Sequence, residues 1–198
     1  MKRTGFLLLA IALLTTALDA QDKQIYNDGS IDYAPPETEF VLSVGASATG
    51  IDYIEYSVDG GEMSRYAEPI QISEEGRHFI TYRAVDITGN RSLEKVYTVV
   101  VDATPPRLAA SATGEAYMNE AGNLYLTSGT RIILEGTDRL SGVRSIMVST
   151  NGEVYREYTG PEQFEEEGPH RGYAYAVDNV GNRSDTFEAS GIVDNSPP

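Results

Sequence analysis

The feature that most constrains this chain is an internal repeat with a period of 92 residues. Segment 25–106 aligns with segment 117–198 without a gap, and 26 of the 82 positions carry the same residue. The matches are densest where 84–86 fall on 176–178 and where 89–92 fall on 181–184. A self-similarity of this length indicates a duplication, so the sequence predicts two units that share one fold.

The alignment also predicts where one unit ends and the next begins. Segment 102–106 (DATPP) falls on 194–198 (DNSPP), which closes the chain, and proline restricts the backbone of such a junction. We therefore predict repeat 1 at 21–106 and repeat 2 at 107–198. Arg107 corresponds to position 15, so most of the leading strand expected at 107–113 has no counterpart in repeat 1 outside the apolar leader.

The first residues have the pattern of a secretory signal peptide. Lys2 and Arg3 precede an apolar run over 6–14, and the small-residue segment 18–20 offers a cleavage site before Gln21. The run is short for a membrane span, so we predict that 1–20 are removed and that the protein is exported to the periplasm, the cell surface or the medium. The chain has no cysteine, so its cores must hold it without disulfides.

Charge narrows the choice of partners. The chain carries 15 basic and 30 acidic residues, and removal of 1–20 leaves 13 and 29. A strongly acidic protein repels nucleic acid and anionic membrane surfaces, so we expect neither as a partner. No second apolar stretch is long enough for a transmembrane helix.

Residue patterns predict strands throughout. Apolar and polar residues alternate over 53–58, 78–86 and 145–150, which is the period of a strand with one buried face. Asp59-Gly60 and Asn151-Gly152 follow two of these segments, and both dipeptides favour hairpin turns. Further strands are expected at 38–44, 95–101, 107–113 and 130–135. Short strands separated by frequent turns are typical of β-sandwiches.

Several motifs resemble a known family. The segments IEYSVDGG (54–61), YRAVDITGN (82–90), DATPP (102–106) and TDRLSGV (137–143) look like bacterial immunoglobulin-like repeats of the kind named after a spirochaetal outer-membrane protein. The resemblance implies an all-β fold of two tandem immunoglobulin-like antiparallel β-sandwich domains. It also implies a spacer or binding role within a surface or secreted protein. Repeat 1 departs from the pattern at Ala46, where repeat 2 has Asp138.

These observations favour a protein that is not an enzyme and needs no cofactor. The two histidines, His78 and His170, occupy equivalent repeat positions, which indicates a role in the scaffold rather than in one active site. We expect a structural or adhesive module at the cell envelope or surface that contacts an unknown protein or glycan. The alternative is a carbohydrate-binding module accessory to a glycan-active enzyme.

Asp138, Asp178 and Asn182 are the candidate metal ligands. Carboxylate and amide oxygens suit calcium, but six or more oxygens are needed and few are in sight. The motif Asp-x-x-Gly-Asn, at 86–90 and 178–182, is better interpreted as a tight turn in which the aspartate accepts backbone hydrogen bonds.

Tyrosines without a tyrosine partner in the other repeat mark a possible ligand surface. An exposed group of them offers a sugar-stacking or protein-binding platform, whereas ordinary strand tyrosines are half-buried. These residues are Tyr53, Tyr155, Tyr173 and Tyr175. The edge of repeat 1 that lacks a leading strand is a candidate for self-association, because unpaired strand edges attract further strands.

Overall fold

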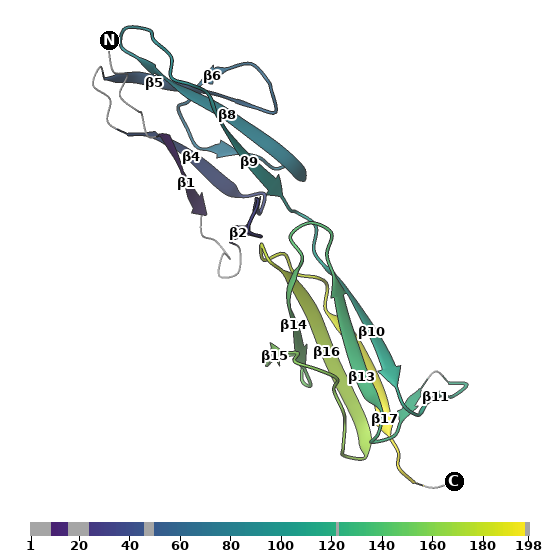
Figure 1. The fold of residues 1–198 in the computed structure, drawn as a ribbon. Coiled ribbons are helices and arrows are strands. Elements are labelled where there is room, and N and C mark those ends of the chain that lie inside the picture. The colour runs from purple at the N-terminus through teal and green to yellow at the C-terminus, as the bar shows by residue number, and fades with distance from the viewer. Residues whose placement is uncertain (1–8, 16–23, 46–49, 122, 197–198) are drawn as a thin grey trace. The chain divides into compact units, whose positions relative to one another are not determined.

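The computed structural model describes residues 9–15, 24–45, 50–121 and 123–196 (Figure 1). It divides into two compact units, Met1–Thr104 and Pro105–Pro198, and the described residues form strands, turns and loops without a helix. The predicted fold class, all-β with two tandem immunoglobulin-like antiparallel β-sandwich domains, is confirmed. The expected cleavage segment 18–20 and Ala46 lie outside the described residues.

Unit 1 consists of two facing sheets. The larger sheet has the strand order β2 (Tyr26–Asn27), β3 (Asp32–Ala34), β9 (Lys95–Val101), β8 (Gly76–Asp86), β5 (Ile51–Val58) and β6 (Ser64–Arg65). The smaller sheet has the order β1 (Leu9–Thr15), β4 (Thr38–Val44) and β7 (Ile70–Gln71). All pairs are antiparallel except β3 with β9, which is parallel.

Unit 2 repeats this arrangement. Its larger sheet has the order β11 (Ala116–Met118), β12 (Leu124–Leu126), β17 (Phe187–Val193), β16 (Gly168–Asp178), β14 (Val143–Ser149) and β15 (Arg156–Glu157). Its smaller sheet pairs β10 (Arg107–Thr113) with β13 (Arg131–Thr137). The pairing of β16 with β17 reproduces that of β8 with β9 at the 92-residue offset, because Gly76↔Val101 becomes Gly168↔Val193. The sequence repeat is therefore also a repeat of strand register.

The leading strands of the two units do not lie at equivalent positions of the 92-residue repeat. In unit 2, β10 pairs with β13 at Leu108↔Gly136. In unit 1, the equivalent position on β4 is Val44, and its partner is Leu9 of β1. In the full chain, part of the apolar leader therefore forms the strand that pairs with β4. The expected edge of repeat 1 is a property of the chain after removal of 1–20.

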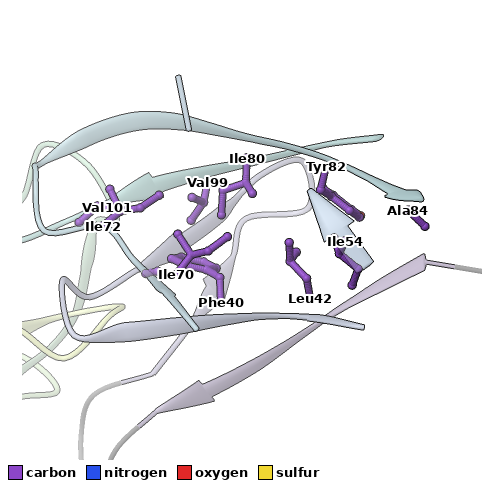
Figure 2. Close-up of a cluster of buried hydrophobic side chains, with 11 residues drawn as sticks. Phe40, Leu42, Ile54, Ile70, Ile72, Ile80, Tyr82, Ala84, Val99 and Val101 are labelled. Atoms are coloured by element: carbon purple, nitrogen blue, oxygen red, sulfur yellow. The ribbon is translucent and has the colours of Figure 1, made fainter. Parts of the chain in front are cut away.

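The core of unit 1 is closely filled (Figure 2). Side chains from both sheets alternate inward along their strands, as the period-two pattern predicts. The buried apolar residues of this cluster are Ala34, Phe40, Leu42, Ile54, Ile70, Ile72, Ile80, Tyr82, Ala84, Val99 and Val101. The corresponding cluster in unit 2 is smaller and consists of Leu134, Val148 and Ala174, with partly buried neighbours.

Candidate functional site

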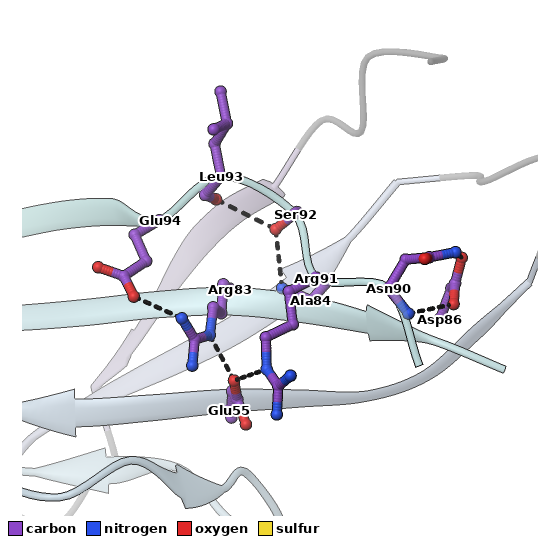
Figure 3. A network of polar contacts seen from close by, with 9 residues as sticks. All are labelled: Glu55, Arg83, Ala84, Asp86, Asn90, Arg91, Ser92, Leu93 and Glu94. Carbon is purple, nitrogen blue, oxygen red and sulfur yellow. Dashed lines mark hydrogen bonds and ion pairs between the residues drawn. The ribbon is translucent and has the colours of Figure 1, made fainter. Parts of the chain in front are cut away.

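The two Asp-x-x-Gly-Asn motifs form the predicted turns. Asp86 Oδ1 accepts hydrogen bonds from the backbone N–H groups of Thr88 (2.9 Å) and Asn90 (2.8 Å), and Asn90 Nδ2 donates to Asp86 Oδ2 at 3.0 Å (Figure 3). The side-chain hydrogen bond from Asn90 is the largest of several that hold the pKa of Asp86 well below its usual range. Gly89 has a φ of 84°, which suits glycine. The carboxylate therefore fixes a turn.

Unit 2 brings its three candidate metal ligands together. Asp178 is fully buried; its Oδ1 accepts from the Asn182 backbone at 2.7 Å and its Oδ2 accepts from Asn182 Nδ2 at 2.8 Å. Asp138 Oδ1 accepts from the backbone N–H groups of Leu140 and Gly142, and carboxylate oxygens of Asp138 and Asp178 lie within 4.8 Å of one another. Both carboxylates thus accept hydrogen bonds that shape loops of unit 2, and a metal ion would have to share them.

The two histidines serve equivalent loops. His78 is 6% exposed, and its ring nitrogens lie 2.7 Å from Asp59 Oδ2 and 2.7 Å from the Glu74 carbonyl oxygen. Burial alone would lower the pKa of His78, but hydrogen bonds to these two acceptors outweigh it and raise the pKa. His170 Nε2 makes the same contact to the Glu166 carbonyl, at 2.6 Å. Both rings tie a loop to the start of a long strand.

The outer face of unit 1 carries an ion-pair network (Figure 3). Glu55 on β5 pairs with Arg83 on β8 and with Arg91, whose Nε is 3.1 Å from Glu55 Oε1. Arg83 also pairs with Glu94 at 2.6 Å. The hydrogen bond from Arg83 is the largest contribution that lowers the pKa of Glu55, which is 8% exposed. The charged groups of this network satisfy one another.

At the equivalent positions, unit 2 carries a different cluster. The 92-residue offset replaces Glu55 by Met147, Arg83 by Tyr175 and Glu94 by Thr186, and it keeps the arginine as Arg183. The Arg183 guanidinium carbon lies 3.5 Å from the centroid of the Tyr175 ring. We call Met147, Tyr155, Tyr175 and Arg183 the aromatic cluster of unit 2.

The two tyrosine rings of this cluster lie close together and are inclined to each other. Tyr155 and Tyr175 have centroids 4.8 Å apart and ring planes inclined by 56°. Arg183 covers one face of Tyr175 and donates to the Thr186 hydroxyl at 3.2 Å. A cation over an aromatic face is stabilising, so the cluster holds its own shape before any partner binds.

The predicted tyrosine surface is thus divided. Tyr155 and Tyr175 meet, whereas the ring of Tyr173, two residues before Tyr175 on β16, lies beside Gly152. Tyr53 belongs to unit 1, where Arg65 lies 4.4 Å from its ring centroid. Met147 and Arg183 are absent from the residues predicted from the sequence. Comparison of the repeats on one strand face, where Glu55 and Arg83 give way to apolar and aromatic residues, is the signal that identifies them.

Comparisons with known proteins add similarities of shape. No protein-family model and no curated protein matches the chain. Fibronectin(III)-like modules of Clostridium thermocellum CbhA are 16% identical (TM-score 0.44; 86% of this chain and 93% of that one). The D00-D0 domain of intimin is 13% identical (0.34; 94% and 100%). Bacteroides ovatus SGBP-B, solved with a mixed-linkage heptasaccharide, is 11% identical (0.27; 93% and 70%). These similarities assign no function.

Within the described part of the chain, no helix has the length and apolar character needed to cross a membrane.

Proposed function

We propose that this chain is an exported, non-catalytic immunoglobulin-like repeat protein that acts as a binding module at the cell envelope or surface. In this proposal, unit 1 is the structural unit and unit 2 contacts a protein partner through its aromatic cluster. One observation carries it: equivalent sheet faces hold an internally paired ionic network in unit 1 and a tyrosine, methionine and arginine cluster in unit 2.

The composition of the cluster supports a protein partner. Tyrosine, methionine and arginine are enriched at the centres of protein interfaces, where ring edges and a planar guanidinium supply contact area at low entropic cost. The ionic network of unit 1 offers less, because a partner would have to compete with charges that already pair with one another around the buried Glu55.

The geometry is less suited to a sugar platform. Stacking on a sugar requires open ring faces that lie roughly in one plane. Here the rings of Tyr155 and Tyr175 are inclined by 56°, and Arg183 occupies a face of Tyr175. A protein surface can instead contact ring edges and tyrosine hydroxyls from the side.

The non-catalytic part of the proposal rests on how the titratable candidates are used. His78 and His170 make the same loop contact in both units, and Asp86 and Asp178 close the same turn. Groups duplicated in this way serve the common scaffold. Export is supported by the leader pattern of the first 20 residues, and N-terminal sequencing of the protein recovered from its native envelope, with Gln21 as the first residue, would test it.

Site-specific photocrosslinking tests the partner contact. A benzophenone amino acid at Tyr155 of the full chain, expressed in its native host, should give one discrete protein adduct that Tyr175→Ala weakens. The same amino acid at Tyr53, which also lies beside an arginine but in unit 1, is the matched control and should give none. Equal adducts from both positions would refute the assignment to unit 2. Glycan-array binding lost in Tyr175→Ala would replace it with the carbohydrate-binding alternative.

A further inference from the structure

Unit 2 contains a cavity of about 480 Å³ between its two sheets. Both sheets contribute apolar side chains to the wall, and the lining includes Leu124, Leu126, Ile132, Leu134, Val148 and Phe164. Pockets that hold small molecules have volumes of roughly 300–1,000 Å³ and mostly apolar walls. Folded cores, in contrast, contain few voids larger than a water molecule.

The repeat shows how the cavity arises. Unit 1 fills the same space with Ile80 and Tyr82 from β8 and with Tyr97 and Val99 from β9 (Figure 2 shows three of the four). At the 92-residue offset, unit 2 has Gly172, Ala174, Ala189 and Gly191. The backbone pairing is the same, since Ile80↔Tyr97 becomes Gly172↔Ala189. Only the side chains have been removed from a shared framework.

A larger side chain elsewhere in unit 2 fills one part of this space, and the rest stays open. A Cβ atom built on Gly191 would lie 3.1 Å from Leu126 Cδ1, and Leu126 replaces the smaller Ala34 of unit 1. A Cβ atom built on Gly172 meets no atom within 4 Å. The space next to Gly172 and Ala189 is therefore empty.

The cavity continues into a polar mouth. A second, adjoining pocket shares Leu124, His170 and Gly191 with it. The residues that line this mouth include the polar residues Asn123, Thr150, Arg171 and Ser190, of which the last three line both pockets. Arg171 pairs with Glu188 at 3.8 Å, and the alternation along β16 and β17 places both residues on the face opposite Gly172, so neither charge points into the cavity.

We propose that unit 2 binds one amphiphilic small molecule, with an aliphatic chain in the cavity and an uncharged hydrogen-bonding head group at the mouth. The apolar wall selects the chain, because an unfilled void loses dispersion contacts that a hydrocarbon restores. The polar rim selects a head group with donors and acceptors. The net charge of −15 disfavours an anionic head. The site does not depend on the partner proposed for the aromatic cluster, because Tyr175 points to the opposite face of β16 from Gly172 and Ala174.

The test uses the full chain, the neutral fluorophore N-phenyl-1-naphthylamine and monolauroylglycerol below its micelle concentration. Gly172→Ile installs the residue of unit 1 in open space and should weaken binding of both compounds at least about ten-fold. The matched control is Gly160→Ile, a glycine of the same unit that also has open space around its Cβ position and does not line the cavity; it should bind as the wild type does. Ala189→Tyr, which likewise installs the residue of unit 1, is the second cavity-filling variant if Gly172→Ile fails to fold, as judged by circular dichroism.

Four results would overturn the proposal. The first is that the wild type does not bind the fluorophore, and the second is that both cavity-filling variants bind it as tightly as the wild type does. The third is that laurate displaces the fluorophore from the wild type and the glyceride does not. The fourth is that the wild type is a dimer and Gly172→Ile is a monomer. The third would assign an anionic head group, and the fourth would assign a second copy of the chain as occupant. The glyceride should also raise the melting temperature of the wild type and of Gly160→Ile, but not of Gly172→Ile, because a ligand stabilises only the form that binds it.

Discussion

Substitution of Leu42 and of Leu134 by alanine would measure how the cavity of unit 2 affects the free energy of unfolding. The two leucines occupy equivalent repeat positions on β4 and β13 and are 4% and 8% exposed. Truncation to alanine removes the same carbons from water-excluded surroundings, so the transfer part of the cost is similar. The remaining part is the dispersion attraction that the removed carbons had to their neighbours. This attraction is weaker for Leu134, because one side of it lines the cavity of unit 2.

Leucine-to-alanine changes in cores cost about 2–5 kcal/mol, and the loss grows with the cavity that they create. We expect about 4 kcal/mol for Leu42→Ala, which opens a hole in a filled cluster, and about 2 kcal/mol for Leu134→Ala. Because the chain has no tryptophan, hydrogen–deuterium exchange with mass spectrometry is the suitable assay, read separately on β4 and β13 in the full chain. The difference corresponds to a roughly thirty-fold larger loss of protection in unit 1. Equal losses would refute the reasoning.

Three further outcomes are expected. The raised pKa of His78 stabilises unit 1 fully below the unfolded-state pKa of about 6.5, and this stabilisation is lost as pH rises through the folded-state pKa. The melting temperature of unit 1 should therefore fall at alkaline pH, and Asp59→Asn should reduce the dependence of the melting temperature on pH. An unchanged pH dependence in the variant would contradict this reasoning. Calcium titration by calorimetry should show no micromolar site, and a micromolar signal that Asp178→Ala removes would disprove this. A chain lacking residues 1–20 loses β1 and should melt first in unit 1 and self-associate through β4, so a monomer with the stability of the full chain would rule out the open-edge argument.

Much of the backbone follows from the residues themselves. The strands expected at 38–44 and 95–101 are β4 and β9, with the bounds that the structure shows. The Asp-x-x-Gly-Asn segments predict turns because one carboxylate can accept several nearby N–H groups, and the hydrogen bonds of Asp86 and Asp178 confirm it. In these cases the interaction partners are close in sequence, so a local pattern contains the information.

The candidate surfaces are harder to predict, because they depend on partners distant in sequence. Tyr155 meets Tyr175 across two strands and a loop, and Tyr173, only two residues away, takes no part in that ring contact. The cavity is a property of volume summed over both sheets. Gly172 and Ala189 look like ordinary small strand residues until the register places them opposite each other.

That register is also what keeps the cavity empty. Along β16, Gly172 and Ala174 point inward while Tyr173 and Tyr175 point to the other face, and a slip of one residue would exchange the two sets and place tyrosine rings in the core. Two features oppose the slip: the Asp178–Asn182 turn anchors one end of the strand, and the Gly168↔Val193 pair fixes the other end as in unit 1. The local hydrogen bonds of the turn therefore hold the small residues inside and the aromatic residues outside, and both the cavity and the aromatic cluster of unit 2 depend on this one strand.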